Sequence, residues 1–249
     1  MYLQNKVEKI ELIYDKYECE LVVSISRLAD FHIQESMPDF LNINEEKYYS
    51  GLHHERKKKS YLLGRHAAKV AVKAALNLEN LKDAEISNGI FEQPVIRCKK
   101  NISSQISLSH CDNIGIAIVF PDTLIVGVDI EKVNIQRYHL LRKLISDSEK
   151  SILLEESESN IKMLTVMWSV KEALSKCIKT GFTIPMSFFE IKNLSHKNEV
   201  FTGHFIHFIQ YQYVAFEQDN YVIAIVYPSQ MQMKIPDKIL GGGHISVEK

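Results

Sequence analysis

Two acidic residues end an apolar stretch in the middle of the chain. Residues 126–131 read VGVDIE, which places Asp129 and Glu131 two positions apart. Alternate residues of a strand lie on one face, so both carboxylates are expected to point the same way. Adjacent carboxylates raise each other's pKa unless a cation neutralises them, and their oxygens suit Mg²⁺ or Mn²⁺. The pattern indicates a divalent-metal site, with solvated acids at an exposed strand end as the alternative.

A second group of ionisable residues lies on an expected helix. Residues 167–176 read MWSVKEALSK, and Glu172 and Lys176 are four positions apart, so they share a helix face. Glu172 is a candidate third oxygen ligand or general base, and Lys176 is a candidate partner for a phosphate. The alternative is a surface ion pair, which contributes roughly a few tenths of a kcal/mol.

Two further patterns suit phosphate binding. Residues 107–110 read SLSH at the end of an expected strand, where Ser109 and His110 can hydrogen-bond phosphate oxygens. Basic residues concentrate at 56–59 (RKKK) and continue to Arg65, whose guanidinium can hold a phosphate by two hydrogen bonds. A structural histidine and a solvated helix face are the alternatives. The basic stretch is short and lacks interleaved aromatic residues, so nucleic-acid binding is not expected.

Composition limits the class of protein. The chain has 249 residues, enough for one or two domains, and its 45% hydrophobic and 24% charged residues are typical of globular proteins. The net charge of −1 gives no general attraction to nucleic acid or anionic membrane. The longest uncharged stretch, residues 200–216, is too short and too polar to span a bilayer, and the charged N-terminus does not resemble a signal peptide. We therefore expect a cytoplasmic protein that does not bind membranes.

The elements that must position these residues follow from hydrophobic periodicity. Helices are predicted at residues 57–76, 138–155 and 161–179. Strands are predicted at residues 21–25, 105–109, 114–120, 124–130, 200–208, 211–216 and 221–227. Strands 114–120 and 124–130 are expected to pair as a hairpin around Pro121. The segment 27–60 is expected to form short helices and loops, and the tail after Pro228 to be loose.

An internal repeat links the two halves of the chain. Residues 111–121 (CDNIGIAIVFP) and 218–228 (QDNYVIAIVYP) agree at seven of eleven positions at an offset of 107 residues. The same offset superposes the two long helices and lays Tyr61 on Trp168, Arg65 on Glu172 and Lys69 on Lys176. A duplicated α+β unit is the preferred interpretation, and coincidence between two buried strands is the alternative.

The repeat predicts the fold class and domain organisation. We expect an α+β protein of two similar lobes, residues 1–122 and 123–249, each a small, mainly antiparallel sheet packed on a long helix. The lobes are expected to be related by a pseudo-two-fold axis. An active site is expected in the cleft between them, with the metal and catalytic motifs in the C-terminal lobe.

Together the motifs resemble the 4′-phosphopantetheinyl transferase superfamily. The family pattern is Gly-(Val/Ile)-Asp-x-Glu followed by (Trp/Phe)-(Ser/Thr/Cys)-x-Lys-Glu-(Ala/Ser)-x-x-Lys, and here GVDIE at 127–131 precedes WSVKEALSK at 168–176. An upstream GRHAA at 64–68 and the Ser-His pair at 109–110 stand in the family's order. The resemblance covers about residues 57–189. The length and the repeat point to the two-lobed, surfactin-synthetase-activating type, which is monomeric.

The resemblance implies an activity and a role for each motif residue. Members move the phosphopantetheine arm of coenzyme A to a serine of an apo acyl or peptidyl carrier protein, with Mg²⁺, and release adenosine 3′,5′-bisphosphate; Mn²⁺ stays open. The implied metal ligands are Asp129, Glu131 and Glu172, and the implied catalytic residues are Glu172 as general base, Lys176 and Asp129. The implied coenzyme A contacts are Arg65 on the 3′-phosphate, Ser109, His110, Lys171 and Lys176, with Lys57 or Lys58 a weaker candidate.

One position departs from the family pattern. Members commonly carry Gly-Lys-Pro before the Ser-His block, whereas residues 92–94 here are Glu-Gln-Pro, so the uncharged Gln93 replaces a lysine that touches coenzyme A. The change bears on coenzyme A affinity more than on the reaction. Two rival functions remain at this point: a Mg²⁺-dependent nucleotide pyrophosphate hydrolase, and a coenzyme A-binding module without turnover. The basic residues Arg137, Arg142 and Lys143 are candidates to meet an acidic carrier-protein helix, with a solvated helix as the alternative.

Overall fold

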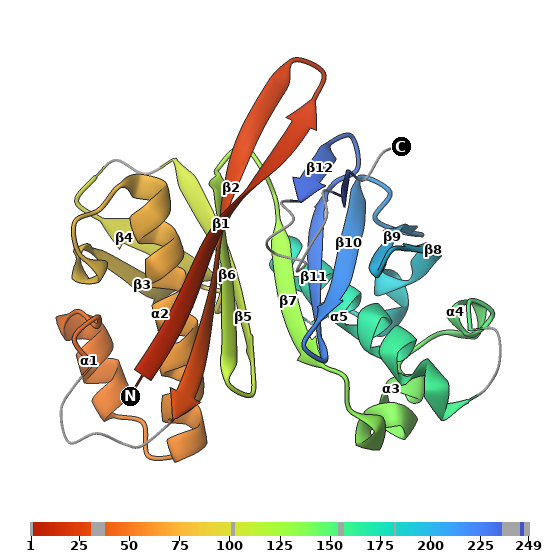
Figure 1. Ribbon diagram of the computed structural model, residues 1–249, viewed down its shortest axis with the longest axis horizontal. Coiled ribbons are helices and arrows are strands. Elements are labelled where there is room, and N and C mark those ends of the chain that lie inside the picture. Colours follow the sequence, from red (N-terminus) through yellow and green to blue (C-terminus); the bar gives the residue numbers. More distant parts are fainter. Residues whose placement is uncertain are drawn as a thin grey trace. The chain divides into compact units, whose positions relative to one another are not determined.

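Two compact units make up the chain. A computed structural model describes residues 2–30, 38–100, 103–153, 157–181, 183–235 and 245–246 (Figure 1). The first unit contains residues up to Leu12 and Glu18–Thr123, and the second contains Ile13–Tyr17 and residues from Leu124 onward. Each unit combines an antiparallel sheet with a long helix, which confirms the α+β fold class. None of the helices in the described part of the chain is long and apolar enough to cross a membrane.

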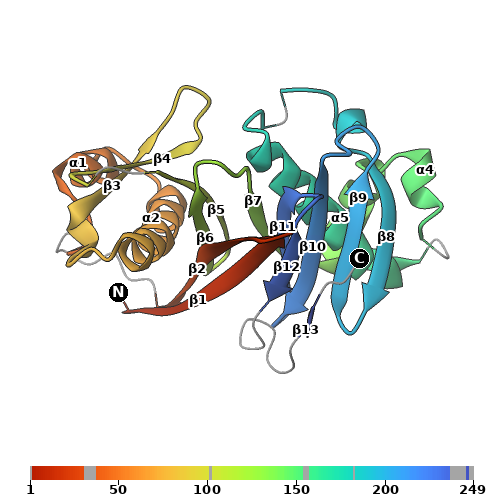
Figure 2. The ribbon, with the colours of Figure 1, turned by 90° about the horizontal axis from the view of Figure 1, so that it is seen from above.

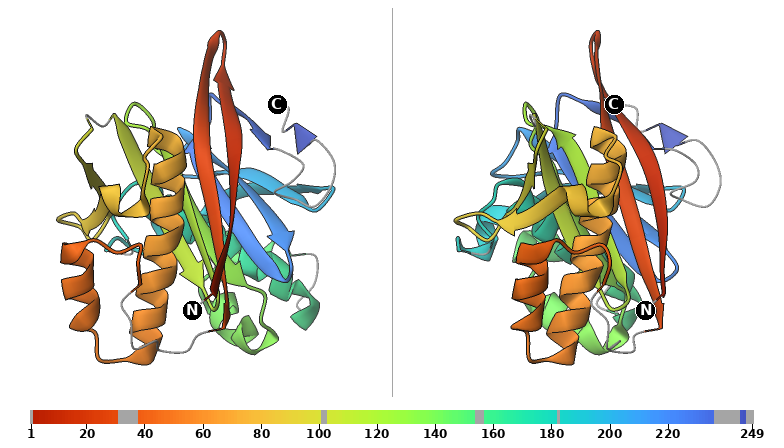
Figure 3. Two further views of the ribbon diagram at one scale, coloured as in Figure 1. Left: turned by 60° about the vertical axis from the view of Figure 1, so that its left-hand side comes forward. Right: turned by 90° about the vertical axis from the view of Figure 1, so that its left-hand side faces the viewer.

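The described residues of the first unit form six strands and two helices. The strands are β1 (Tyr2–Tyr14), β2 (Tyr17–Asp30), β3 (Ala84–Asn88), β4 (Pro94–Cys98), β5 (Ser104–Cys111) and β6 (Ile114–Pro121). The helices are α1 (Ile43–Ser50) and α2 (Glu55–Leu76), with a short 3₁₀ turn, η1 (Leu81–Asp83). Four strands lie side by side in the order β1-β2-β6-β5, and β3 pairs with β4. Helix α2 packs against β5 and β6 on one side and faces β3 on another (Figure 2). Figure 3 shows α1 and α2 from two further directions.

The second unit has a five-stranded sheet in the order β7-β11-β10-β9-β8. Its strands are β7 (Gly127–Lys132), β8 (Ile191–Lys197), β9 (Val200–Phe205), β10 (Tyr211–Gln218) and β11 (Tyr221–Pro228). Helix α5 (Ile161–Cys177) packs on β7, β11 and β10. Short helices lie before it and one 3₁₀ turn after it: η2 (Ile135–Arg137), α3 (Tyr138–Lys143), α4 (Asp147–Lys150), η3 (Glu158–Asn160) and η4 (Met186–Phe189). Strands β12 (Gln232–Ile235) and β13 (Ile245–Ser246) pair with each other.

The internal repeat holds for the sheets. In β5–β6, Ser104 pairs with Pro121, and in β10–β11, Tyr211 pairs with Pro228, so both strands of the hairpin are displaced by 107 residues. The two hairpins are therefore equal in length and register. The offset of 107 is wrong for the helices, however, as the buried contacts of Lys69 and Lys171 described below show. The second unit has five more residues between its buried lysine and its hairpin, so Lys69 corresponds to Lys171 and not to Lys176.

Four other predictions about elements were wrong. Strand β6 pairs with β2 and β5, while β7 pairs with β11, so residues 114–120 and 124–130 do not form a hairpin. The expected helix 138–155 is broken into α3 and α4. The segment 27–60 begins with strand β2 instead of a loop, and the N-terminal strand β1 was not predicted. The expected loose tail contains β12 and β13, and its remaining residues 236–244 and 247–249 lie outside the described residues.

Glycine brings α5 and β7 together at the start of the acidic strand. A Cβ atom on Gly127 would lie 2.0 Å from the carbonyl oxygen of Ala173 and 2.7 Å from the backbone nitrogen of Cys177. Real Cβ atoms do not approach backbone atoms this closely. Any side chain at residue 127 would therefore push α5 away from the strand that carries Asp129 and Glu131.

We predict that Gly127→Ala lowers the free energy of unfolding by about 3 kcal/mol or more, because the methyl group overlaps helix backbone that cannot move locally. Gly64→Ala is the matched control: its Cβ would lie 3.5 Å from Leu108 Cδ1, an ordinary contact, and alanine favours the helix. Urea unfolding followed by circular dichroism measures both. Equal effects of the two variants would contradict the close approach at Gly127.

Candidate functional site

The buried carboxylate of Asp129 joins β7 to α5. Its side chain is 5% exposed, and its two oxygens have different partners on the helix. Lys176 Nζ donates to Oδ1 at 2.6 Å, and Ser169 Oγ donates to Oδ2 at 2.8 Å. A buried carboxylate needs such compensation because an uncompensated buried charge is strongly destabilising. Lys176 therefore pairs with Asp129, and not simply with Glu172 on its own helix.

Glu131 lies on the same face of β7 as Asp129, as predicted. Trp168 Nε1 donates to its Oε1 at 2.8 Å, and Arg137 Nη1 donates to its Oε2 at 2.6 Å. Trp168 belongs to α5, whereas Arg137 ends the 3₁₀ turn η2. Arg137 was predicted only as a candidate contact for an acidic carrier-protein helix. The turn that places it beside Glu131 begins at Asn134, whose side chain accepts from the backbone amide of Gln136 at 2.9 Å.

Glu172 completes a cluster of three carboxylates. The pKa of its carboxyl is raised to about 7, first by burial and then by the charges of Asp129 and Glu131, while the charges of Lys176 and Arg137 oppose the rise. Within the described part of the chain, no hydrogen bond or ion pair reaches this carboxyl. Glu172 is thus the member of the cluster with a carboxyl available to a ligand. We call Asp129, Glu131, Glu172, Lys176 and Arg137 the acidic cluster.

The donor chemistry of the acidic cluster fits a hard divalent cation. All three candidate ligands are carboxylates, and the raised pKa of Glu172 shows that another positive charge among them would be favourable. The atoms are not pre-assembled, since among the described residues no three His, Cys, Asp or Glu side chains lie as a ready metal-binding group. Lys176 and Arg137 instead take one oxygen each of Asp129 and Glu131.

Lys171 lies apart from the acidic cluster. Its side chain is 2% exposed, and its Nζ donates to Glu149 Oε2 at 2.6 Å and to the carbonyl oxygen of Leu144 at 3.3 Å. The expected contact with coenzyme A stays a prediction, but in this structure the ammonium of Lys171 is committed to buried protein groups. Adjacent helix positions point to different sides, so Lys171 need not share the surroundings of Glu172, but its partner Glu149 is distant in sequence and was not predicted.

The first unit brings together the two motifs expected to hold coenzyme A. A Cβ on Gly64 would lie 3.8 Å from the His110 ring, so the Gly-Arg block of α2 adjoins the Ser-His end of β5. Arg65 Nη2 donates to Asn88 Oδ1 at 3.0 Å, and its guanidinium lies 4.8 Å from the centroid of the Tyr61 ring. Its buried Nε has no hydrogen-bond partner among the described atoms.

The remaining basic candidates and Gln93 lie at the edges of this unit. Lys57 is exposed in the first turn of α2, and Lys58 Nζ lies 5.5 Å from the centroid of the Tyr49 ring. Gln93 Oε1 accepts from the backbone amide of Phe91 at 2.9 Å, which closes the β3–β4 turn. Gln93 therefore has a local structural contact where the family commonly has a coenzyme A lysine.

The repeat allows the acidic strand to be compared with its counterpart in the first unit. Asp129 and Glu131 pair with Ala224 and Val222 of β11, and the residues at the corresponding ladder positions of β2 are Ser24 and Ser26. Ser24 Oγ is buried without a hydrogen-bond partner among the described atoms. Ser26 Oγ lies 2.9 Å from Nδ1 of His66, at the position where Glu131 meets Trp168. The strand geometry is retained, but serines occupy these two positions of β2 in place of the carboxylates.

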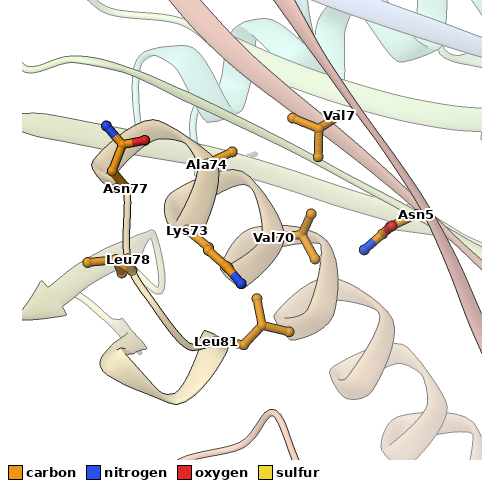
Figure 4. Close-up of a pocket in the computed structure, with 8 residues that line it drawn as sticks. All are labelled: Asn5, Val7, Val70, Lys73, Ala74, Asn77, Leu78 and Leu81. Atoms are coloured by element: carbon orange, nitrogen blue, oxygen red, sulfur yellow. The ribbon is translucent and has the colours of Figure 1, made fainter.

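The long helix α2 also lacks the charged residues that α5 carries at the corresponding positions. With Lys69 matched to Lys171, Val70 and Ala74 stand where α5 carries Glu172 and Lys176. A cavity of about 560 Å³ adjoins this face of α2, and Figure 4 shows its lining. The lining residues are Asn5, Val7, Val70, Lys73, Ala74, Asn77, Leu78 and Leu81. No carboxylate lines this cavity, so the carboxylate chemistry belongs to the second unit.

Comparisons with known proteins point to the same unit. Residues 125–226 match the sequence profile of the 4′-phosphopantetheinyl transferase superfamily. The chain is also similar to a holo-[acyl-carrier-protein] synthase of Acholeplasma laidlawii, with 29% identity over 108 residues. That similarity covers 41% of this chain and 92% of the relative. The profile match includes β7, α5 and hence every residue of the acidic cluster.

His66 of the first unit predicts how the stability of the protein depends on pH. Burial lowers the pKa of its imidazole to about 4, only partly offset by the charge of Asp39. The unfolded chain therefore binds a proton first, and stability present above about pH 6.5 is lost as the pH falls toward 4. We predict a loss on the order of 2–3 kcal/mol over this range that is absent in His66→Gln. Urea unfolding at pH 7, 5.5 and 4 checks this, and an unchanged slope in the variant would assign the loss to other groups.

Proposed function

We propose that the protein transfers the phosphopantetheine arm of coenzyme A to a serine of an apo carrier protein and releases adenosine 3′,5′-bisphosphate. The observation that supports this most is the acidic cluster itself: three carboxylates and Lys176, assembled by β7 and α5, lie within the part of the chain that matches the transferase profile. Presence of a second, similarly built unit supports the two-lobed, surfactin-synthetase-activating type and a monomeric protein.

The chain's own residues account for the main requirements of this reaction. The serine oxygen forms a bond to the phosphorus next to the pantetheine arm, and the bond from that phosphorus to the bridging oxygen breaks. The serine proton passes to Glu172, the carboxylate of the acidic cluster that no hydrogen bond or ion pair reaches among the described residues. Lys176 can turn from Asp129 to the phosphoryl oxygens and stabilise their charge.

The metal and coenzyme A contacts are part of the same proposal. Asp129, Glu131 and Glu172 would hold Mg²⁺, which neutralises charge on the leaving bisphosphate when bound. We assign the phosphates of coenzyme A to Lys176 and to the first unit's Arg65, Ser109 and His110, with Lys57 as an additional contact. Arg65 suits this role because a guanidinium can hold a phosphate by two hydrogen bonds.

The carrier protein is assigned to the segment that follows β7. We call residues 133–153, which follow β7, the connecting segment. Ile135 and Leu140 in it are 48% and 54% exposed, and Arg137, Arg142 and Lys143 give it positive charge. Exposed apolar residues among basic ones suit an acidic helix, because charge guides the approach and apolar contact adds affinity.

We predict that this protein, coenzyme A and Mg²⁺ add one phosphopantetheine to an apo carrier protein, and that EDTA prevents the addition. Intact-mass spectrometry of the carrier measures it. Glu172→Gln should lower the rate at least a thousandfold, because the base and a ligand are lost together. The exposed Glu158→Gln is the control and should keep full activity.

The same assay separates the rival functions. Appearance of adenosine 3′,5′-bisphosphate and free phosphopantetheine without any carrier product would establish transfer to water, as in a pyrophosphate hydrolase. Binding of coenzyme A without either product, across fatty-acid, polyketide and peptide carriers, would indicate a module without turnover.

Arg65 gives a second prediction, on substrate binding. Arg65→Ala should raise the KM for coenzyme A about tenfold or more with a small change in kcat, because a phosphate contact is lost. Arg97→Ala, an exposed arginine on β4 that donates to Ser87, is the matched control. Initial rates over a range of coenzyme A concentrations measure this, and an unchanged KM would place the 3′-phosphate elsewhere.

A further inference from the structure

The same buried arrangement of lysine and glutamate occurs once in each unit. In the first, Lys69 Nζ lies 2.5 Å from Glu45 Oε2 and donates to the carbonyl oxygen of Phe40 at 2.8 Å. In the second, Lys171 Nζ lies 2.6 Å from Glu149 Oε2 and donates to the carbonyl oxygen of Leu144 at 3.3 Å. All four charged side chains are at most 3% exposed.

Each glutamate also makes the same backbone contacts. Glu45 and Glu149 are the third residues of α1 and α4, and each accepts from the N-cap backbone amide, from Asn42 at 3.0 Å and from Ser146 at 2.8 Å. The other carboxylate oxygen accepts from a strand amide. Ile86 of β3 donates to Glu45 at 3.0 Å, and Ile191 of β8 donates to Glu149 at 2.9 Å.

The accepting carbonyls complete the correspondence. Phe40 and Leu144 each stand two residues before the N-cap of the short helix. The lysine therefore joins the long helix to the short helix and to the loop before it, while the glutamate joins both to a strand. We call this set of contacts the strut.

The first unit shows that the strut can be present without the carboxylates of the acidic cluster. The first unit has Ser24, Ser26 and Val70 where the second has the three carboxylates, yet it keeps the strut intact. The strut is therefore independent of the acidic cluster. Lys171 needs no role in substrate binding to explain its presence.

In the second unit the strut acts on the connecting segment. Its short-helix end is α4, and its carbonyl partner Leu144 directly follows α3. Arg137, at the other end of α3, forms the ion pair with Glu131 at 2.6 Å. A change at Lys171 would thus reach Glu131 through the connecting segment, although Lys171 does not contact Glu131.

We propose that Lys171 is a positioning residue: through Glu149 it holds the connecting segment against α5, and so sets the position of Arg137 and of the surface assigned to the carrier protein. The carrier-protein part of this inference rests on the proposed function. It replaces the expectation that Lys171 contacts coenzyme A.

The test compares Lys171→Met with its counterpart Lys69→Met in the full-length protein. Hydrogen-exchange mass spectrometry should show at least tenfold faster exchange of peptides from the connecting segment in Lys171→Met, with α5 and β7 unchanged. Lys69→Met should leave the connecting segment protected and should instead accelerate exchange in α1 and β3. In transfer assays, Lys171→Met should raise the KM for the carrier protein about tenfold and leave the KM for coenzyme A within twofold.

A neutral partner variant guards against simple misfolding. Lys171→Met leaves Glu149 as a buried unpaired charge. The single variant Glu149→Gln and the double variant Lys171→Met/Glu149→Gln are therefore measured as well, and the double variant should be no less stable than the less stable single variant. A rise in the KM for coenzyme A with normal exchange of the connecting segment would overturn the proposal in favour of a ligand role. Uniformly faster exchange across the second unit in the double variant would show that the strut stabilises the whole unit and does not specifically position the connecting segment. If the wild-type protein transfers nothing, the proposed function fails while the exchange data still decide the role of Lys171.

Discussion

The close contact between the backbones of α5 and β7 at Gly127 is the constraint on which the acidic cluster depends. It places the helix near enough to the strand for Ser169 and Lys176 to reach both oxygens of Asp129. Two residues further along β7, the same closeness lets Trp168 reach Glu131. Buried carboxylates are tolerated only when their oxygens are compensated, so the short separation of helix and strand is what permits acids on this strand. The absence of a side chain at Gly127 thus allows the carboxylates of Asp129 and Glu131 to be compensated by residues of α5.

Duplication separates the residues that maintain the fold from those that do chemistry. Both units keep a hairpin of the same register, a long helix and a strut in which a buried lysine meets a capping glutamate. Asp129 and Glu131 of the second unit correspond to Ser24 and Ser26 of the first. Ser24 is buried, and its hydroxyl has no hydrogen-bond partner among the described atoms.

Local patterns were sufficient to predict the elements that carry the acids. Alternation in β7 placed Asp129 and Glu131 on one face, and helical spacing placed Glu172 and Lys176 together, because both periodicities are properties of the chain itself. Strand pairing is different, since it depends on partners distant in sequence. Strands β6 and β7 are neighbours in the chain and both apolar, so they resembled a hairpin, yet each pairs elsewhere.

The roles of three charged residues could not be derived from sequence for a related reason. The sequence around a lysine is the same whether the lysine faces a ligand or a buried carboxylate, and only the position of Glu149 distinguishes the two for Lys171. The offset of 107 residues matched Lys69 with the wrong residue of the second unit. Residues added between the helix and the hairpin change their spacing but leave the sequence pattern of each element unchanged. Arg137 reaches Glu131 only because the chain turns back after β7.

The balance of charge in the acidic cluster bears on how the proposed reaction begins. Lys176 and Arg137 neutralise Asp129 and Glu131, and the raised pKa of Glu172 keeps that carboxyl largely neutral below about pH 7. Taken alone, the cluster therefore offers a cation little net negative charge. A substrate with a pyrophosphate gives both cationic side chains a more strongly charged partner than a carboxylate. Once they turn to it, Asp129 and Glu131 are released from these ion pairs but keep their contacts with Ser169 and Trp168, and Glu172 would lose its proton more readily beside an added cation. Until then, the ion pairs seen here keep these carboxylates from binding a cation. Under the proposed function, the site becomes competent only when the phosphate-bearing substrate is present.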